Sequence, residues 1–322
     1  MKPLISVCIP TYNAADYIEE TLKTITAQTW KNLEIIVGDN ASTDRTKEIV
    51  ESYSERFDGR VRYYQNMTNL GYAGNCNKLI EHAAGDFICI FHSDDIYDHT
   101  LIEKQVRILN SNPMTAAVFC FHQRVNNELE KIDDHKYQFE KNDKSILTVN
   151  FQDYLHGFIL NNENFLVCPS SMVRKEIYLE LGGYDTRLKY IEDQDMWTRI
   201  LQKYQISIIN DKLMLYRCHQ LQGSSFYSSN KRRDLKPSIK YLKSLIKESD
   251  LYTALYSEKL AELEAIDLVD LARNAAFENN RTLYSQLITE SIKCKEISRF
   301  FWKHAIIQKL PIWISFRIIR FK

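Results

Sequence analysis

The sequence predicts an α/β fold in which a mostly parallel, Rossmann-like sheet is flanked by helices. Short apolar runs alternate with amphipathic segments along the first half of the chain, and such alternation favours parallel strands joined by right-handed crossovers. One apolar run, which begins at Phe87, leads to two adjacent carboxylates, Asp94 and Asp95. Buried paired negative charges are unfavourable unless a cation or ligand compensates them. Because open α/β sheets bind ligands at the carboxyl ends of their strands, these two acids mark a candidate site.

The first elements are an apolar run and the amphipathic segment that follows it. Residues 4–9 predict a strand that ends at Pro10, since proline cannot continue a central ladder. Apolar side chains recur at helical spacing over residues 17–25, and Asn13 or Asp16 can cap the start of this helix. We therefore expect a loop between Pro10 and the helix at the carboxyl edge of the sheet.

Two further strand–helix units follow the first. Residues 33–37 predict a second strand, and residues 42–53 predict a helix whose first turn holds Asp44, where a carboxylate suits the helix dipole. Residues 60–65 predict a third strand and residues 75–84 a third helix. The strand that ends at the two aspartates comes next.

The rest of the chain divides into a continuation of this domain and a helical region. Residues 116–121 predict another strand, and the polar, aperiodic stretch 126–144 predicts an exposed insertion. A Gly-Ser-Ser run then marks a boundary, so we expect one domain over 1–222 and a helical region over 223–322. Residues 234–298 are rich in Leu, Lys, Glu and Ala at helical spacing, which favours helices there.

Composition places the chain among ordinary globular proteins and gives it two oppositely charged parts. It carries 42 basic and 42 acidic residues, of which 18 basic and 11 acidic residues lie from Phe226 onward. The basic residues form no dedicated stripe with aromatic partners, so a nucleic-acid binder is not expected. The seven cysteines contain no Cys-x-x-Cys pair, which fits a reducing cytoplasm. We expect neither a signal peptide after Met1 nor an apolar run of membrane-spanning length.

Five short motifs in order give the chain a family resemblance. They are SVCIPTYN at 6–13, IIVGDNASTD at 35–44, NLGYAGN at 69–75, the segment from Gly85-Asp86 to Asp95, and Glu192-Asp193. The chain resembles inverting family 2 glycosyltransferases with the GT-A fold, of the bacterial surface-polysaccharide type. The resemblance covers roughly residues 4–220. It implies transfer of a sugar from a UDP- or TDP-type nucleotide sugar to a hydroxyl acceptor.

The first three motifs, by this resemblance, bind the nucleotide. The loop after the first strand can wrap a flat base, Tyr12 offers a ring face, and Asp39 can accept a hydrogen bond from the imide N–H of uracil or thymine. Glycines in the third motif let the backbone approach a ligand near a helix amino end. The expected nucleotide-binding residues are Pro10, Thr11, Tyr12, Asn13, Asp39, Asn69, Gly71, Asn75 and Asp94.

The acidic motif, by the same resemblance, holds Mn²⁺ or Mg²⁺. Asp95 is expected to be the direct ligand, while Asp94 faces the ribose or supports the metal. Hard divalent cations prefer oxygen ligands. Many relatives have an acid where this chain has His92, so we expect His92 to support or pack against the site rather than ligate the metal. His219 is either a residue near the metal or part of a hinge loop.

Glu192 and Asp193 precede a helix whose apolar side chains recur at i, i+3, i+4 and i+7. Acids at a helix start are expected from the dipole alone, but the family places its general base here. We assign that role to Asp193, with Glu192 orienting the acceptor, and rank Asp195 below both. Arg217 is open between a phosphate ligand and a surface charge.

The end of the chain, residues 299–322, mixes aromatic and basic residues without an acid. This mixture suits an anionic membrane surface, so we expect a cytoplasmic enzyme that can bind the inner face of the plasma membrane. A helix docked on the domain, or a dimer contact, is the alternative. The acceptor is then a growing surface polysaccharide or a lipid-linked oligosaccharide.

Deletion of residues 299–322 is expected to move the protein from the membrane fraction to the soluble fraction after cell lysis. Fractionation followed by immunoblotting checks this, and an unchanged distribution would remove the membrane role.

Two other functions compete with glycosyl transfer. A nucleotidyltransferase shares a base-binding sheet and acidic metal residues, but it should carry a phosphate loop rich in glycine and lysine, which residues 10–13 do not supply. A non-catalytic homologue that binds a nucleotide sugar is the second alternative, and the departure at His92 favours it slightly.

Overall fold

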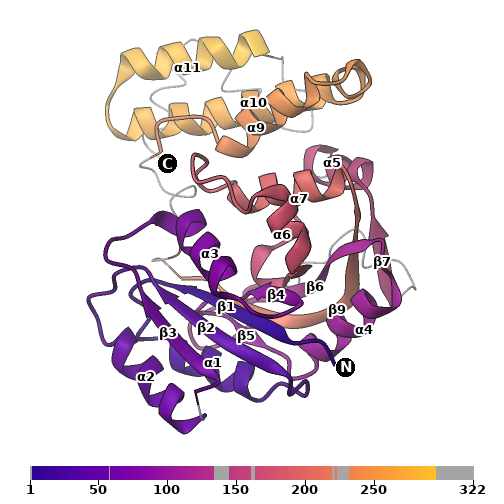
Figure 1. Cartoon of the computed structure of the whole chain (residues 1–322). Helices are drawn as coiled ribbons and strands as arrows, with labels where there is room; N and C mark the ends of the chain where they lie inside the picture. The colour runs from indigo at the N-terminus through magenta and orange to yellow at the C-terminus, as the bar shows by residue number, and fades with distance from the viewer. Residues whose placement is uncertain are drawn as a thin grey trace. The chain divides into compact units, whose positions relative to one another are not determined.

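The computed structural model describes residues 2–57, 59–133, 145–160, 164–219, 222 and 232–294 (Figure 1). The chain forms two compact units, one of residues 1–158 and 162–219 and the other of residues 159–161 and 220–322. The Gly-Ser-Ser run at 223–225 and the chain end 299–322 lie outside the described residues. The domain boundary at 222 therefore stays a proposal.

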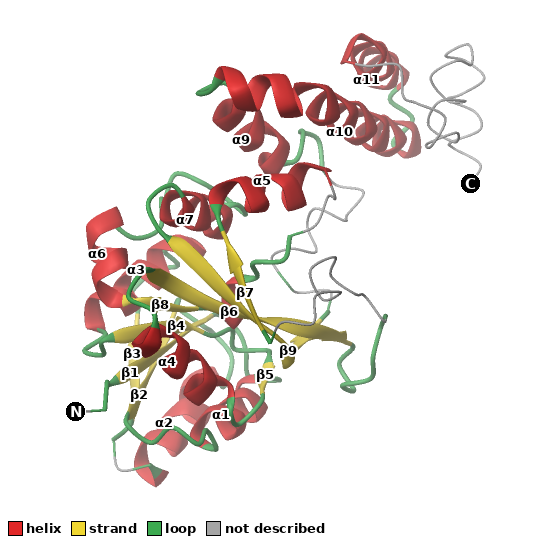
Figure 2. Cartoon of the chain, turned by 90° about the vertical axis from the view of Figure 1, so that its right-hand side faces the viewer, coloured by secondary structure: helices red, strands yellow, loops and turns green. Residues whose placement is uncertain are grey.

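The first unit is built on one sheet. Its strands are β1 (Ile5–Thr11), β2 (Leu33–Asp39), β3 (Val61–Gln65), β4 (Phe87–Ile90), β5 (Ile96–Tyr97), β6 (Thr115–Val125), β7 (Ile146–Val149), β8 (Met172–Arg174) and β9 (Gln205–Arg217). Within the described residues their order is β3-β2-β1-β4-β8-β6-β9-β5, and β7 pairs with β9 (Figure 2).

Strands β1 to β4 are parallel, as predicted, but the rest of the sheet is mixed. Strand β8 is antiparallel to both β4 and β6, β9 is parallel to β6, and β5 and β7 are antiparallel to β9. The prediction of a mostly parallel sheet therefore holds for the first four strands. The added antiparallel strands are two to four residues long, too short for a periodic signal in the sequence.

Helices cover both faces of this sheet. They are α1 (Ile18–Thr26), α2 (Thr46–Arg56), α3 (Gly71–His82), α4 (Leu101–Ser111), α5 (Phe151–Leu160), α6 (Lys175–Leu181) and α7 (Glu192–Leu201), with a 3₁₀ turn at Cys168–Ser170. Helices α1, α2 and α4 lie on one face of the sheet, and α3, α6 and α7 lie on the other (Figure 2). Their apolar side chains accordingly belong to two different core clusters. Neighbouring residues of β1 alternate between the two cores, as in a strand buried on both faces: Val7 and Ile9 point one way and Cys8 the other.

Several predicted boundaries are wrong. Strand β1 continues past Pro10, which pairs with Gly38 in register, and ends at Thr11. Helix α1 has no side-chain cap, so neither Asn13 nor Asp16 caps it. The strand that starts at Phe87 ends at Ile90, before the two aspartates, which lie in the following loop.

Two helices begin at places that the sequence did not indicate. Helix α2 starts at Thr46, so Asp44 lies before its first turn and accepts hydrogen bonds from the backbone N–H groups of Thr46 and Ala15, each at 3.0 Å. Helix α3 starts at Gly71, whose φ of 74° lies in the left-handed region that glycine tolerates. Gly71 and Gly74 therefore belong to α3 and not to a loop before it.

The second unit is helical, as predicted. It contains α9 (Pro237–Ile246), α10 (Asp250–Phe277) and α11 (Arg281–Cys294), and α10 packs against both others. Its core holds an ion pair in which both guanidinium NH groups of Arg232 donate to the Asp267 carboxylate at 2.7 Å. Within the described residues no helix is both long and apolar enough to cross a membrane.

Candidate active site

The carboxyl ends of β1, β2 and β4 meet at one edge of the sheet. Thr11 and Asp39 end β1 and β2 in register, and the Phe91 N–H donates to Cys8 O at 2.9 Å. Strand β1 lies between β2 and β4, so the order of the sheet reverses there. Such a switch point opens a crevice where α/β proteins bind ligands.

Asp95 is the most constrained residue of the acidic loop. Its side chain is fully buried and its Oδ1 accepts the Arg217 backbone N–H at 3.0 Å. Among the described residues Oδ2 has no hydrogen-bond partner. Burial, and then the negative charge of Asp94, raise the pKa of Asp95 well above its usual value. A buried, unsatisfied carboxylate oxygen is the feature expected of a cation ligand.

Asp94 contacts His219, which follows the end of β9. Its Oδ2 lies 2.9 Å from His219 Nε2, and the His219 ring packs on Tyr17 with ring centres 4.6 Å apart. Burial acts to raise the pKa of Asp94, but the bond to His219 and the nearby His92 outweigh it, so the pKa lies below its usual value. His219 thus contacts a candidate metal ligand.

Arg217 is not a surface charge. It is buried, and its guanidinium donates to the Glu20 carboxylate at 2.6 Å, Asn127 O at 2.6 Å and Asp94 O at 2.8 Å. These bonds tie β9 to the acidic loop and to α1. Arg217 therefore holds the loop in place through β9.

His92 lies beside the two aspartates and is also bound to Tyr72 of α3. Its Nε2 is 3.0 Å from the Tyr72 hydroxyl, and its Nδ1 is 3.9 Å from Asp95 Oδ2. The Tyr72 hydroxyl in turn donates to Cys168 Sγ at 3.1 Å. Sequence reasoning missed the parts played by Tyr72 and Cys168, and the only signal was the position of Tyr72 inside the third motif.

Asp39 is buried at the end of β2. Its Oδ1 accepts the Ser42 N–H at 2.8 Å, and its Oδ2 accepts the Tyr63 hydroxyl. The carboxylate is therefore fixed by its neighbours before any ligand arrives, and both oxygens retain further lone pairs.

Two asparagines of the third motif join α3 to the end of β2. Asn75 is buried and donates to Gly38 O at 2.7 Å. Asn69 Oδ1 accepts from Asn40 Nδ2 at 2.8 Å and from the Gly71 N–H at 2.9 Å. The structure thus brings these residues to the predicted edge, where they form hydrogen bonds with neighbouring protein groups.

The loop after β1 presents a different surface. Tyr12 is 53% exposed, so its ring face is open to a partner. Asn13 takes a left-handed φ of 48° and its Oδ1 accepts the Thr43 N–H at 2.9 Å. Thr11 is buried, and its carbonyl accepts the Asn40 N–H at 2.8 Å. Pro10 is only partly buried.

Asp193 stands in the first turn of α7, where Gln194 N–H donates to its Oδ1 at 2.8 Å. Burial raises the pKa of Asp193 to about 7. Besides burial, its negative charge raises the pKa of the Tyr72 hydroxyl and of the Cys168 thiol. Burial also raises the pKa of Glu192.

Asp195 has a structural role on the same helix. It pairs with Arg199 at 2.8 Å, and Arg199 also donates to the carbonyls of Leu181 and Gly183, each at 2.8 Å. Gly183 has a φ of 71°, and the added Cβ of any other residue would lie 2.5 Å from Asn77 Oδ1. The turn at 182–185 is therefore held closely against α3 and α7.

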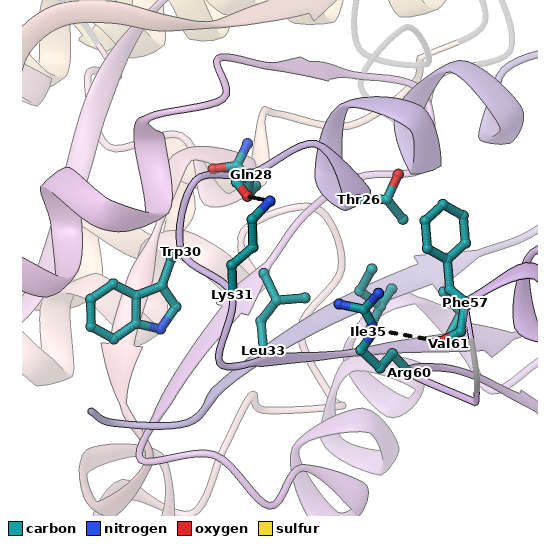
Figure 3. A pocket seen from close by; sticks show the side chains of 9 residues that line it. All are labelled: Thr26, Gln28, Trp30, Lys31, Leu33, Ile35, Phe57, Arg60 and Val61. Carbon is teal, nitrogen blue, oxygen red and sulfur yellow. Dashed lines mark hydrogen bonds between the residues drawn. The ribbon is translucent and has the colours of Figure 1, made fainter. Parts of the chain in front are cut away.

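A small cavity lies at the opposite edge of the sheet (Figure 3). It is lined by Thr26, Gln28, Trp30, Lys31, Leu33, Ile35, Phe57, Arg60 and Val61. Leu33 is the first residue of β2, whereas Asp39 is the last. With a volume of about 10 Å³ it has room for one water molecule, so it cannot hold a sugar nucleotide.

Comparison with known proteins agrees with this geometry. The model of the family described as Glycosyl transferase family 2 matches residues 6–182. The chain belongs to glycosyl transferase family 2. An uncharacterized glycosyltransferase of Methanocaldococcus jannaschii is 33% identical over 222 residues, which are 67% of this chain and 71% of the relative. One of Rickettsia typhi is 30% identical over 229 residues, 70% of this chain and 67% of the relative.

Solved structures support the fold. Residues 1–349 of S. aureus TarS in complex with UDP-GlcNAc align with a TM-score of 0.64 at 18% identity, over 98% of this chain and 88% of that one. A Pyrobaculum calidifontis mannosyltransferase in complex with GDP-Man and Mn²⁺ aligns with a TM-score of 0.61 at 18% identity, over 100% and 88%. The chain is thus a glycosyltransferase with a GT-A-like fold, and the nucleotidyltransferase alternative falls away.

Proposed function

We propose that this enzyme transfers a sugar from a UDP- or TDP-type nucleotide sugar to a hydroxyl group, with inversion at the anomeric carbon and Asp193 as the general base. The observation that carries the proposal is the Asp193 carboxylate at the start of α7, whose pKa burial raises to about 7. A base of this pKa is ionised in part near neutral pH and still accepts a proton readily.

The reaction then needs one displacement. Asp193 takes the proton from the acceptor hydroxyl as that oxygen bonds to the anomeric carbon, and the bond from this carbon to the nucleotide phosphate breaks. The nucleoside diphosphate leaves with the bonding electrons. Glu192, buried beside Asp193, orients the acceptor. Tyr72, whose hydroxyl contacts His92, is also within the electrostatic influence of Asp193.

The nucleotide binds along the edge formed by β1, β2 and α3. The exposed ring of Tyr12 stacks on the base, and the loop residues Pro10, Thr11 and Asn13 surround it. Asp39 accepts the imide N–H, and its fixed orientation toward Ser42 and Tyr63 lowers the cost of ordering it. Asn69, Gly71 and Asn75 shape the wall at the start of α3 by their bonds to β2.

Asp94 and Asp95 fit a divalent cation, Mn²⁺ or Mg²⁺. The unsatisfied, buried Oδ2 of Asp95 offers the direct ligand, and Asp94, oriented by His219, supports the ion or the ribose. When bound, such an ion neutralises charge that develops on the departing diphosphate. Arg217 and Glu20 keep the acidic loop at the crevice.

The proposed class of acceptor is inferred from residues 299–322, which are predicted to bind a membrane. We propose a growing surface polysaccharide or a lipid-linked oligosaccharide, used at the cytoplasmic face of the membrane. Residues 299–322, on which this depends, lie outside the described residues.

A thermal-shift screen of UDP-, TDP- and GDP-sugars, each with and without Mn²⁺, tests the donor. The correct sugar nucleotide binds only the folded state, so it should raise the Tm. At a concentration of a hundred times its Kd, it should increase the free energy of unfolding by about 2.7 kcal/mol. Release of nucleoside diphosphate from that donor in the presence of a hydroxyl acceptor separates an enzyme from a homologue that only binds. Stabilisation by UDP- or TDP-sugars without any turnover would contradict the proposal.

A further inference from the structure

We propose that His92 is itself a metal ligand, through Nδ1, and that this nitrogen makes the site prefer Mn²⁺ to Mg²⁺. This reverses the expectation drawn from the sequence, in which His92 only supports the site. The inference rests on the proposed metal site at Asp94 and Asp95 and adds a third ligand to it.

The first support is the position of the ring. His92, Asp94 and Asp95 each offer one ligand atom, and these atoms all lie within 4.8 Å of one another. Ligands on opposite sides of a small divalent ion, each about 2.1 Å from it, are about 4.2 Å apart. Three ligands of one ion cannot all be opposite one another, and adjacent ligands are about 3.0 Å apart, so the three groups would have to approach one another by up to roughly 1–2 Å to share one cation. The orphaned Oδ2 of Asp95 is the atom that faces His92 Nδ1, at 3.9 Å.

The second support is the direction of the hydrogen bonds behind the ring. The Tyr72 hydroxyl has one hydrogen, and it is donated to Cys168 Sγ at 3.1 Å. The same hydroxyl lies 3.0 Å from His92 Nε2. With its hydrogen directed to Cys168 it can only accept there, and on this ground we assign the ring proton to Nε2. Nδ1 of the neutral ring is then left with a lone pair that faces the two aspartates.

This arrangement has the form of a metal-binding histidine. Histidine ligands usually donate their other ring N–H to a protein acceptor, which fixes the tautomer and the ring orientation. The Tyr72 hydroxyl is that acceptor here, and the His92 backbone N–H donates to the Tyr97 hydroxyl at 2.8 Å, which fixes the backbone of the same residue. Tyr72 is thus a positioning residue for His92.

The chemistry of the nitrogen sets the choice of ion. Mg²⁺ takes oxygen ligands almost exclusively. Imidazole binds divalent first-row transition-metal ions, which include Mn²⁺, more tightly than it binds Mg²⁺. A site with two carboxylates and one imidazole therefore loses affinity for Mg²⁺ relative to Mn²⁺. A third carboxylate at position 92 would remove this difference.

Electron paramagnetic resonance of Mn²⁺ bound to the full-length protein, alone and with UDP, tests the inference without any turnover. Pulsed spectra of the wild type should show a directly bonded ¹⁴N. The signal should disappear in His92→Gln and persist in His219→Gln. Tyr72→Phe, which removes the acceptor of the Nε2 proton, should weaken Mn²⁺ binding by roughly tenfold and keep the nitrogen signal. His82→Gln, a change on the far end of α3, is the matched control and should alter neither.

Competition between the two ions gives a second measurement. His92→Asp should bind Mg²⁺ more tightly and lower the ratio of Mg²⁺ to Mn²⁺ dissociation constants by roughly tenfold. Bound Mn²⁺ without a nitrogen signal, or a signal lost in His219→Gln but kept in His92→Gln, would overturn this inference and leave the proposed function standing. No Mn²⁺ binding at all, with or without UDP, would overturn the metal site and this inference together.

Discussion

Replacement of Asp193 by asparagine is expected to lower kcat by roughly 10²–10⁴-fold, the usual contribution of a positioned general base. The amide keeps the shape of the side chain and can accept the Gln194 N–H bond, but it cannot take a proton from the acceptor. The KM for the nucleotide sugar should change little, because the donor is bound by residues on β1, β2 and α3. Initial rates at varied donor concentration measure both constants.

The raised pKa of Asp193 also predicts how kcat and folding stability change with pH. Burial raises the pKa of Asp193 to about 7, so kcat of the wild type should rise with pH and level off above about pH 7. The unfolded chain loses the same proton near its ordinary pKa of 3.8. Between these values the folded state holds more protons than the unfolded state, so the contribution of Asp193 to stability falls as pH rises toward 7.

Asp193→Asn should therefore be as stable as the wild type at pH 8, or more stable, while it is nearly inactive. Asp195→Asn is the matched control in the same helical turn. It breaks the ion pair with Arg199, which holds the 181–183 carbonyls, so it should lower the Tm but keep the wild-type pH profile. An Asp193→Asn enzyme with kcat within a few fold of the wild type would exclude the base role.

The alternation of apolar runs was enough to predict the first half of the fold. It placed β1 to β4 and their helices in the right order, because β1, β2 and β4 are largely buried on both faces and each helix has one apolar stripe. The element ends were less predictable. Gly71 looks like a loop residue, yet it is the first residue of α3. Strand β8, with three residues, is too short for periodicity, so the mixed half of the sheet had no signal.

The candidate site divides in the same way. Acids that follow an apolar strand or begin a helix are visible in the sequence, so Asp94, Asp95 and Asp193 could be named. The contacts that fix them come from distant segments: Arg217 binds Glu20 across 197 positions, and Tyr72 meets Cys168 across 96. Pairing at such separations depends on the finished sheet, which brings β9 beside the acidic loop. Arg217 could therefore not be recognised as a buried clamp from its local sequence.

Replacement of Asp95 by asparagine is the other change with a large expected effect. It should lower kcat by at least about 10²-fold, since an ion that stabilises a leaving diphosphate supplies several kcal/mol. The asparagine Oδ1 can still accept the Arg217 N–H, now found at 3.0 Å. Burial and the charge of Asp94 raise the pKa of Asp95, so loss of this carboxylate also relieves an unfavourable buried charge. Without metal, the variant should therefore be at least as stable as the wild type.

The response to Mn²⁺ separates this role from a structural one. At a hundred times its Kd, the ion should stabilise the wild type by about 2.7 kcal/mol and raise its Tm by roughly 5–10 °C, and Asp95→Asn should show almost no rise. Asp98→Asn is the matched control: its carboxylate lies three positions away and accepts the Thr100 N–H at 2.8 Å, so that variant should keep the full Mn²⁺ response. If Mn²⁺ raised the Tm of Asp95→Asn as much as that of the wild type, the ion would bind elsewhere. The Asp95 carboxylate affects Mn²⁺ binding only if it is a ligand of the ion.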